Sequence, residues 1–288
     1  MIKEKQNQIL KQLNKFSPKF IGQLRDLSET DWAIQSRCDD WTVKDVMSHL
    51  SSVLTNYLIF IDSAKNEENL LDDPNSSRPE PGNLDGKSFA EFLSERAKET
   101  SKSFDSKDSL INELELRFQK LLDGFNSCQD NQWNLPAYHP VNWVSIQGIL
   151  LWTLFESTIH TWDALNAVDE EYLVDENLAP LLPEYFCNKL INRWFKTTDS
   201  SDSPSQTLAV NFGTLNGLRI ASSSGKLDIE ELPINSFDSD AEIHTTASEF
   251  ALLITGRKNL SESIEDSSTQ LTGNQSHVDS FSKWFTGS

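Results

Sequence analysis

The sequence has few cysteines, few basic residues and no long apolar stretch. Only three of its 288 residues are cysteine and they stand far apart, which excludes a disulfide framework and favours a reducing compartment. Lysine and arginine total 25 against 44 acidic residues, so the formal charge is −19 and nucleic acids and anionic membranes are repelled. The densest apolar run, residues 149–155, is shorter than the roughly 20 residues of a membrane-spanning helix. We therefore expect no nucleic-acid partner and no membrane span.

What is present favours a folded protein of two domains. Hydrophobic residues make up 37% of the chain and include eight Trp, enough to build a core despite the acidity. A length of 288 residues is typical of two domains. Residues 1–8 are mostly polar and no apolar segment follows them, so a secretory signal is not supported. We expect a cytoplasmic protein.

The first part of the chain predicts a bundle of helices. Apolar residues recur every three or four positions over residues 9–27, 42–61, 88–126 and 143–168, with a possible break in the third stretch near Ser106. Thr42 and Asp45 stand at the positions of a capping box. A polar, proline-containing loop, residues 66–87, separates the second stretch from the third. Four such helices predict a helical bundle over residues 1–168.

The rest of the sequence predicts a smaller α+β domain. A helical pattern over 181–194 precedes residues 197–205, rich in Thr, Asp and Ser, so residues 169–205 are expected to be a helix and a linker. Short β-prone runs and two helical patterns follow, at residues 207–212, 218–221, 241–245, 248–255 and 277–285. The predicted fold is a four-helix bundle followed by a small α+β domain over residues 206–288.

Ionisable residues lie on faces of two predicted helices that should be apolar. On the fourth helix, Glu156, His160 and Asp163 share one face at spacings of three or four, and His49 lies on the inner stripe of the second helix. A buried unpaired charge costs several kcal/mol, and residues 143–168 contain no Lys or Arg. Glu156 must therefore be protonated, be paired or bind a cation.

Two interpretations of this cluster are possible. His49, Glu156 and His160 offer two imidazoles and one carboxylate, the donor set of a catalytic zinc site, which could equally hold iron(II). Alternatively, Glu156 and His160 are hydrogen-bonded to each other and His49 is an ordinary core histidine. For a single buried polar residue this is the usual situation. The presence of all three donors on buried faces favours the metal site.

Two segments resemble the motifs of a known family. Residues 38–50, with Cys38, Trp41, Thr42, Val43, Asp45, His49 and Leu50, resemble the Cys-x-x-Trp-Thr-Val-x-Asp-x-x-x-His-Leu motif of the mycothiol-dependent maleylpyruvate isomerase family, which is related to the DinB-like bundles. Residues 156–163 are similar to that family's Glu-x-x-x-His-x-Trp-Asp motif. The resemblance implies that His49, Glu156 and His160 bind a divalent metal, usually zinc.

The resemblance extends over most of the chain. Residues 247–257 are similar to a sterol-carrier-like C-terminal domain, which implies that Arg257 reaches the metal cleft and holds an anionic substrate. The alternative for Arg257 is a surface charge at a helix C-terminus. Asp39 and Asp40 stand where the family often has Pro and Gly. Because the composition is unlike that of proteins known to use mycothiol, the identity of any thiol is left open.

Three further residues are weaker candidates. Asp163 could orient a ligand or satisfy local polar groups. His139, between two prolines, could face the cleft but is expected to be an ordinary loop residue. Cys38 is expected to be structural because Arg37 is the only cationic neighbour that could lower its pKa.

We therefore expect a metal-dependent enzyme that acts on a small, anionic substrate. The metal would bind a low-molecular-weight thiol as thiolate, for isomerisation or S-transfer, with Arg257 and Asp163 as further catalytic residues. The same site with water in place of the thiol would make a hydrolase. A non-catalytic protein that binds a small ligand is the alternative of a different class. The sequence does not select the substrate, the thiol, the metal or the oligomeric state.

Overall fold

The computed structural model describes residues 3–38, 40–74, 76–82, 86–188, 190–196, 206–223, 226–234, 239 and 241–285 of the chain. The chain divides into two compact units, Met1–Leu178 and Ala179–Ser288. The first unit is helical and the second contains a sheet, which confirms the predicted fold class. The predicted linker, residues 197–205, lies outside the described residues. No helix in the described ranges has the length and apolar character needed to cross a bilayer.

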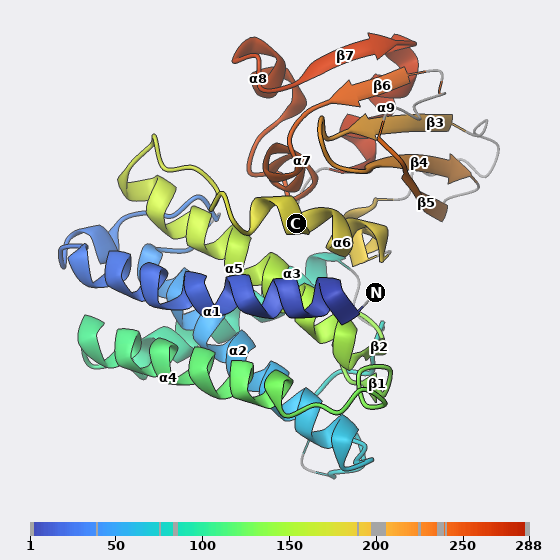
Figure 1. Ribbon diagram of the computed structural model, residues 1–288. Coiled ribbons are helices and arrows are strands. Elements are labelled where there is room, and N and C mark those ends of the chain that lie inside the picture. The colour runs from blue at the N-terminus through green and yellow to red at the C-terminus, as the bar shows by residue number, and fades with distance from the viewer. Residues whose placement is uncertain are drawn as a thin grey trace. The chain divides into compact units, whose positions relative to one another are not determined.

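Helices dominate the first unit. They are α1 (Lys3–Asp26), the 3-10 helix η1 (Asp31–Ala33), α2 (Val43–Lys65), α3 (Gly86–Lys102), α4 (Lys107–Asn126) and α5 (Ile146–Val168). Helices α1, α2, α4 and α5 form the bundle and α3 packs against α2 (Figure 1). The third predicted stretch is therefore two helices, divided at Ser106, which caps α4 by accepting from the backbone N–H of Ser109. Helix α1 continues through Pro18 as one element.

The start of α2 sets the position of His49. Thr42 accepts from the backbone N–H of Asp45, whose carboxylate accepts from the backbone N–H of Thr42, so the predicted capping box is confirmed. Just before it, Asp40 has a φ of 62°, in the left-handed region where glycine is least strained. The departure from the family pattern at Asp40 thus falls where the backbone favours glycine, yet the helix forms because its cap is intact. Asp39 lies outside the described residues.

Large apolar side chains fill the bundle. The ring of Phe118 on α4 meets the rings of Phe16 and Phe20 on α1 edge to face, with centroids 6.4 and 6.3 Å apart. Helix α5 is buried on almost every side, which is why its sequence is apolar around its whole circumference. The polar side chains of α5 are therefore held in the interior of the bundle.

A short hairpin lies before α5. Its strands are β1 (Pro136–Ala137) and β2 (Val144–Ser145), and Ser145 caps α5 by accepting from the backbone N–H of Gly148. The hairpin contacts α2 and α5. The loop that contains His139 is thereby folded against the bundle rather than into solvent.

The second unit is built around a five-stranded sheet of order β5-β4-β3-β6-β7. Its strands are β3 (Gln206–Asn211), β4 (Gly217–Ser223), β5 (Lys226–Leu232), β6 (Ala241–His244) and β7 (Gln270–Gly273). Strands β3 and β6 are parallel and the other neighbours are antiparallel. The helical elements are η2 (Ala179–Leu181), α6 (Leu182–Cys187), η3 (Leu190–Trp194), α7 (Ala247–Ile254), α8 (Leu260–Glu265) and α9 (Gln275–Trp284).

The predicted helix before the linker packs with the sheet unit. Helix α6 contacts α7 and β5, and Phe186 on α6 meets Phe250 on α7 edge to face at 5.0 Å. Helix α9 packs on β3 and β6. The sequence predicted β3, β4, β6, α7 and α9 but not β5, β7 or α8.

Candidate metal centre

Three donor side chains converge between α2 and α5. His49 lies on α2 and Glu156 and His160 lie one turn apart on α5, so all three project into the interface of these packed helices. One ligand atom from each lies within 4.8 Å of the others. His49 Nε2 is 3.6 Å and His160 Nε2 is 3.0 Å from Glu156 Oε2. The helical spacing predicted from sequence therefore brings these three donors together.

Asp163 orients the imidazole of His160. Nδ1 of His160 lies 2.9 Å from Oδ2 of Asp163, one turn further along α5, and the carboxylate accepts the hydrogen bond. Asp163 is fully buried. With its proton on Nδ1, a neutral His160 turns the lone pair of Nε2 towards Glu156. This pairing of a carboxylate with the far nitrogen of a histidine is typical of metal sites.

One carboxylate oxygen of Glu156, Oε2, has no hydrogen-bond partner. This atom is buried, and although His160 Nε2 lies 3.0 Å away, the contact lacks hydrogen-bond geometry. Two acceptor atoms at such a distance repel each other unless a proton or a metal cation lies between them. Glu156 therefore stands where a cation would satisfy it.

Charged neighbours within the cluster shift the pKa values of Glu156 and His160. Burial raises the pKa of Glu156, but the contacts with His160 and His49 outweigh burial and hold the pKa below its usual range. Burial lowers the pKa of His160, but Asp163 and Glu156 outweigh it and raise the pKa to about 9. The cluster therefore favours one positive charge among its acidic groups, which a proton or a cation supplies.

The ring of Trp41 covers the cluster. Its centroid lies 4.8 Å from that of His49 and 6.2 Å from that of His160. Trp41 Nε1 donates to Oγ of Ser94 on α3 over 3.2 Å, which fixes the indole. In the sequence, Trp41 stands out only as one residue of the motif over residues 38–50. It belongs to the site because the capping turn folds it back over His49.

The residues present fit a divalent cation. Two imidazole nitrogens and one carboxylate oxygen are a usual donor set for zinc, and three protein ligands leave a position for a substrate. The buried, unsatisfied Oε2 of Glu156 is the observation on which this fit rests. In the alternative of a hydrogen-bonded pair, a protonated His160 would supply the positive charge to Glu156 instead.

His139 is buried, against the expectation of an ordinary loop residue. It is 5% exposed, its Nε2 lies 3.3 Å from the hydroxyl of Tyr57, and its ring stacks on Trp152 at 4.6 Å. Tyr57 follows His49 by two turns of α2, and Trp152 precedes Glu156 by one turn of α5. The prolines at 136 and 140 predict a loop, and a loop is present, but the β1–β2 hairpin folds it onto the bundle.

The remaining sequence candidates are Arg257 and Cys38. Arg257 belongs to the second unit, where it follows Gly256 and its guanidinium donates to the carbonyl of Thr255 over 3.1 Å. This contact lies just after the C-terminal end of α7 (Ala247–Ile254). Cys38 is partly exposed, and neither it nor the other two cysteines forms a disulfide.

Comparison with known proteins identifies the family of the first unit and structures of similar fold. The family described as "Mycothiol maleylpyruvate isomerase N-terminal domain" matches residues 18–165. No curated protein sequence matches the chain. Among solved structures, a histidine-to-alanine mutant of the mycothiol-dependent maleylpyruvate isomerase has a TM-score of 0.60 at 12% identity, covering 93% of this chain and 94% of that one.

A second structure of that isomerase has a TM-score of 0.54 at 12% identity, covering 88% of this chain and 90% of the other. At this identity the similarity establishes the fold, over both units. The family match spans more than half of the chain, from within α1 to within the last turn of α5, and includes His49, Glu156 and His160. The chain therefore belongs to the mycothiol maleylpyruvate isomerase N-terminal domain family.

Proposed function

We propose that this protein is a divalent-metal-dependent enzyme that uses a low-molecular-weight thiol. The thiol would either catalyse isomerisation of a small substrate or be joined to the substrate through its sulfur atom, as in an S-transferase. The single observation that carries the proposal is the buried Glu156 Oε2, which has no hydrogen bond and lies beside two histidine nitrogens. His49, Glu156 and His160 would hold the ion, and zinc suits the donor set best. Family membership supports the isomerase, since the matched family is described by that activity.

Side chains next to the ion would each have a separate role. A bound divalent cation lowers the pKa of a thiol or a water molecule next to it. Asp163 keeps the proton on Nδ1 of His160, so Nε2 stays available as a donor. Trp41 covers the two imidazoles and limits the access of water to them. These groups would fix the site before the substrate enters.

The thiol would supply the covalent chemistry of isomerisation. A thiolate adds to one carbon of an electron-poor double bond, rotation follows about the resulting single bond, and loss of the same thiol restores the double bond. The thiol is regenerated, so atoms and electrons balance without an oxidant. An S-transferase would use the same addition and keep the new carbon–sulfur bond.

We further propose that the substrate is anionic and that Arg257 binds it. A guanidinium offers a planar pair of donors to a carboxylate, and it would counter the repulsion between an anion and a chain of charge −19. Arg257 is partly exposed. Orientation by Arg257 would add to the rate because the metal ligands alone leave the substrate free to rotate.

The test is a rate measurement with zinc-loaded full-length protein and maleylpyruvate as the probe. Mycothiol, glutathione and cysteine are supplied in turn, and conversion of the cis double bond to the trans form is followed by absorbance. We expect a thiol-dependent rate that Arg257→Ala lowers, in kcat/KM, by about tenfold or more while metal content is kept. The matched control is Arg219→Ala in the same unit, whose guanidinium pairs with Glu230 on the surface.

Each other outcome assigns a different function. An equal rate without thiol contradicts the thiol-using enzyme, and hydrolysis products would identify a hydrolase at the same site. A protein that binds the probe but takes up no metal and turns nothing over is a binding protein. An unchanged rate in Arg257→Ala excludes that residue from the mechanism.

A further inference from the structure

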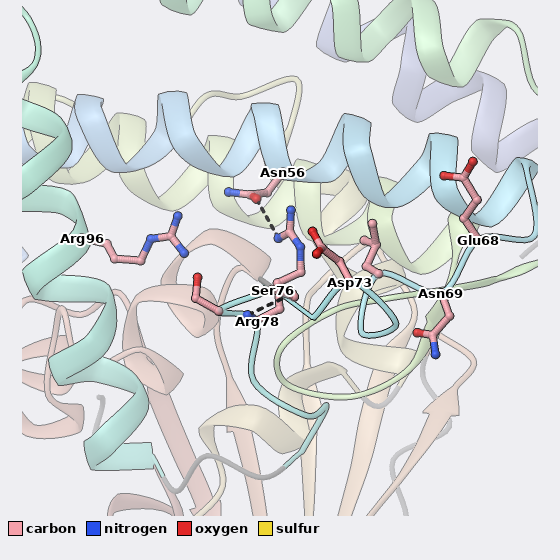
Figure 2. A pocket seen from close by; sticks show the side chains of 9 residues that line it. Asn56, Glu68, Asn69, Asp73, Ser76, Arg78 and Arg96 are labelled. Carbon is pink, nitrogen blue, oxygen red and sulfur yellow. Dashed lines mark hydrogen bonds between the residues drawn. The ribbon is translucent and has the colours of Figure 1, made fainter.

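The first unit contains a polar pocket that shares no residue with the metal centre. Its volume is about 530 Å³ and it lies between α2, the segment that follows α2 and α3. Nine residues line it, namely Asn56, Glu68, Asn69, Leu70, Asp73, Ser76, Ser77, Arg78 and Arg96. Figure 2 shows the guanidinium of Arg96 directed towards Arg78 from α3. The lining is almost entirely polar, so the pocket is suited to a charged or hydrogen-bonding ligand.

Arg78 is held in place by neutral groups. Its Nη1 donates to Oδ1 of Asn56 over 3.1 Å, and its backbone N–H donates to Oγ of Ser76. The guanidinium lies over the rings of Phe60 and Tyr138, with 5.3 and 5.9 Å to the ring centroids. These contacts hold the guanidinium in place. Of its five N–H donors, one is used in the hydrogen bond to Asn56.

Arg96 brings a second positive charge to the same pocket. Its guanidinium rests over the ring of Phe92, one turn earlier on α3, at 5.4 Å. Burial lowers the pKa of Arg78, Tyr138 raises it, and the positive charge of Arg96 lowers it further. The two guanidinium groups are thus close enough to repel each other.

Neither arginine forms an ion pair with any residue that the structure describes. This is notable in a chain with 44 acidic residues, where carboxylate partners are abundant. Glu68 and Asp73 line the pocket as well. Stacking on Phe60 and Tyr138 and the hydrogen bond to Asn56 hold Arg78 in place, but none of these groups carries a negative charge at neutral pH. An anion in the pocket would pair with both guanidinium groups.

We propose that this pocket binds a small ligand through a carboxylate or phosphate group, which Arg78 and Arg96 hold together. A guanidinium fork matches the oxygen spacing of both groups. The hydroxyl of Ser76 offers a hydrogen bond to the remainder of the ligand, and the acidic side chain of Glu68 favours a hydroxyl or ammonium substituent there. The site is independent of the metal centre and of the function proposed for it.

The test is calorimetric titration of the full-length protein with succinate and, separately, with inorganic phosphate, at constant ionic strength set by sodium chloride. We expect one equivalent of at least one anion to bind. Arg78→Gln and Arg96→Gln should each weaken binding by about tenfold or more, because each removes charge-assisted hydrogen bonds. Arg96 is exposed, so its substitution leaves the packing of the fold in place.

Two control variants locate the binding. Arg25→Gln removes a surface arginine that pairs with Glu115, and Glu156→Gln alters the metal centre; both should bind the anion as the unchanged protein does. Binding of phosphate alone identifies a phosphate-bearing ligand, and binding of succinate alone a carboxylate. The proposal is overturned if neither anion binds, or if binding survives in Arg78→Gln or Arg96→Gln.

Discussion

His160 and Asp163 are joined by a hydrogen bond of 2.9 Å between Nδ1 and Oδ2, three residues apart on α5. Asp163 is fully buried, so this bond forms within the bundle and is not weakened by water. The opposite nitrogen of His160, Nε2, lies 3.0 Å from Glu156 Oε2. One bond therefore fixes which nitrogen of His160 is offered to the candidate metal centre.

Asp163→Asn should weaken metal binding without removing a ligand. The amide oxygen can still accept from Nδ1, but the neutral side chain makes His160 a weaker donor. We expect zinc affinity to fall by about 10- to 100-fold, as measured by competition with a chromophoric chelator. Asp130→Asn, which changes an exposed carboxylate paired with Lys3, is the control and should leave zinc affinity unchanged. Equal affinity in Asp163→Asn and the unchanged protein would assign Asp163 a purely structural role.

Zinc should stabilise the folded protein against heat, and Glu156→Gln should abolish this effect. A ligand that binds only the folded state adds about 2.7 kcal/mol at 100 times its Kd. The melting temperature of the chelator-treated protein is measured with and without added zinc. The metal joins only α2 and α5, and the bundle has its own apolar core, so the variant should still fold. A zinc-induced rise of the same size in Glu156→Gln would contradict the ligand assignment.

The metal donors could be predicted because a helix repeats every 3.6 residues. Glu156, His160 and Asp163 share one face for that reason alone. Because residues 143–168 contain no Lys or Arg, buried carboxylates on this face need a positive charge from elsewhere. His49 was identified in the same way on α2. The structure adds which atoms meet, since the 3.6 Å from His49 to Glu156 depends on how two helices pack.

Other parts of the site depended on tertiary contacts that no local pattern encodes. Trp41 lies over His49 because the turn around Asp40 folds back, and His139 is buried because a hairpin packs on α2 and α5. Strand β5 has a buried Leu227 and Ile229 between charged residues, an alternation that is present in the sequence but short and highly charged. Strand β7 is a four-residue edge strand with little burial, so it carries almost no pattern.

Phe118→Ala should destabilise the bundle strongly. Phe118 is 1% exposed and packs edge to face with Phe16 and Phe20, so its loss leaves a cavity. We expect the free energy of unfolding, from urea denaturation, to fall by about 3–5 kcal/mol. Leu116→Ala is the matched control on the same helix, since Leu116 is 46% exposed and should cost no more than about 0.5 kcal/mol. A similar loss in both variants would contradict the packing described.

Asp175 should make the first unit sensitive to acid. Burial raises the pKa of Asp175, but Lys19 and the backbone N–H groups of Asn177 and Leu178 outweigh it, so the pKa lies below its ordinary value. The carboxylate therefore contributes stability above about pH 4, which is lost as the pH falls through the lowered pKa.

Asp175→Asn removes this contribution. The difference in unfolding free energy between the unchanged protein and the variant should be constant from about pH 5 to 7 and shrink below about pH 4. Urea denaturation at several pH values measures it. A difference that stayed constant to the lowest pH would contradict the account of Asp175.

The most direct test of the metal centre is elemental analysis of purified protein, dialysed against a weak chelator, beside the variants His49→Ala, Glu156→Gln and His160→Ala. We predict one divalent ion per chain in the unchanged protein and less than about a tenth of that in each variant, since each removes one of three protein ligands. His244→Ala is the control, because His244 is partly exposed and pairs with Glu242 in the second unit, and it should keep the full equivalent. A full equivalent of metal in His160→Ala would contradict the site built on His49, Glu156 and His160.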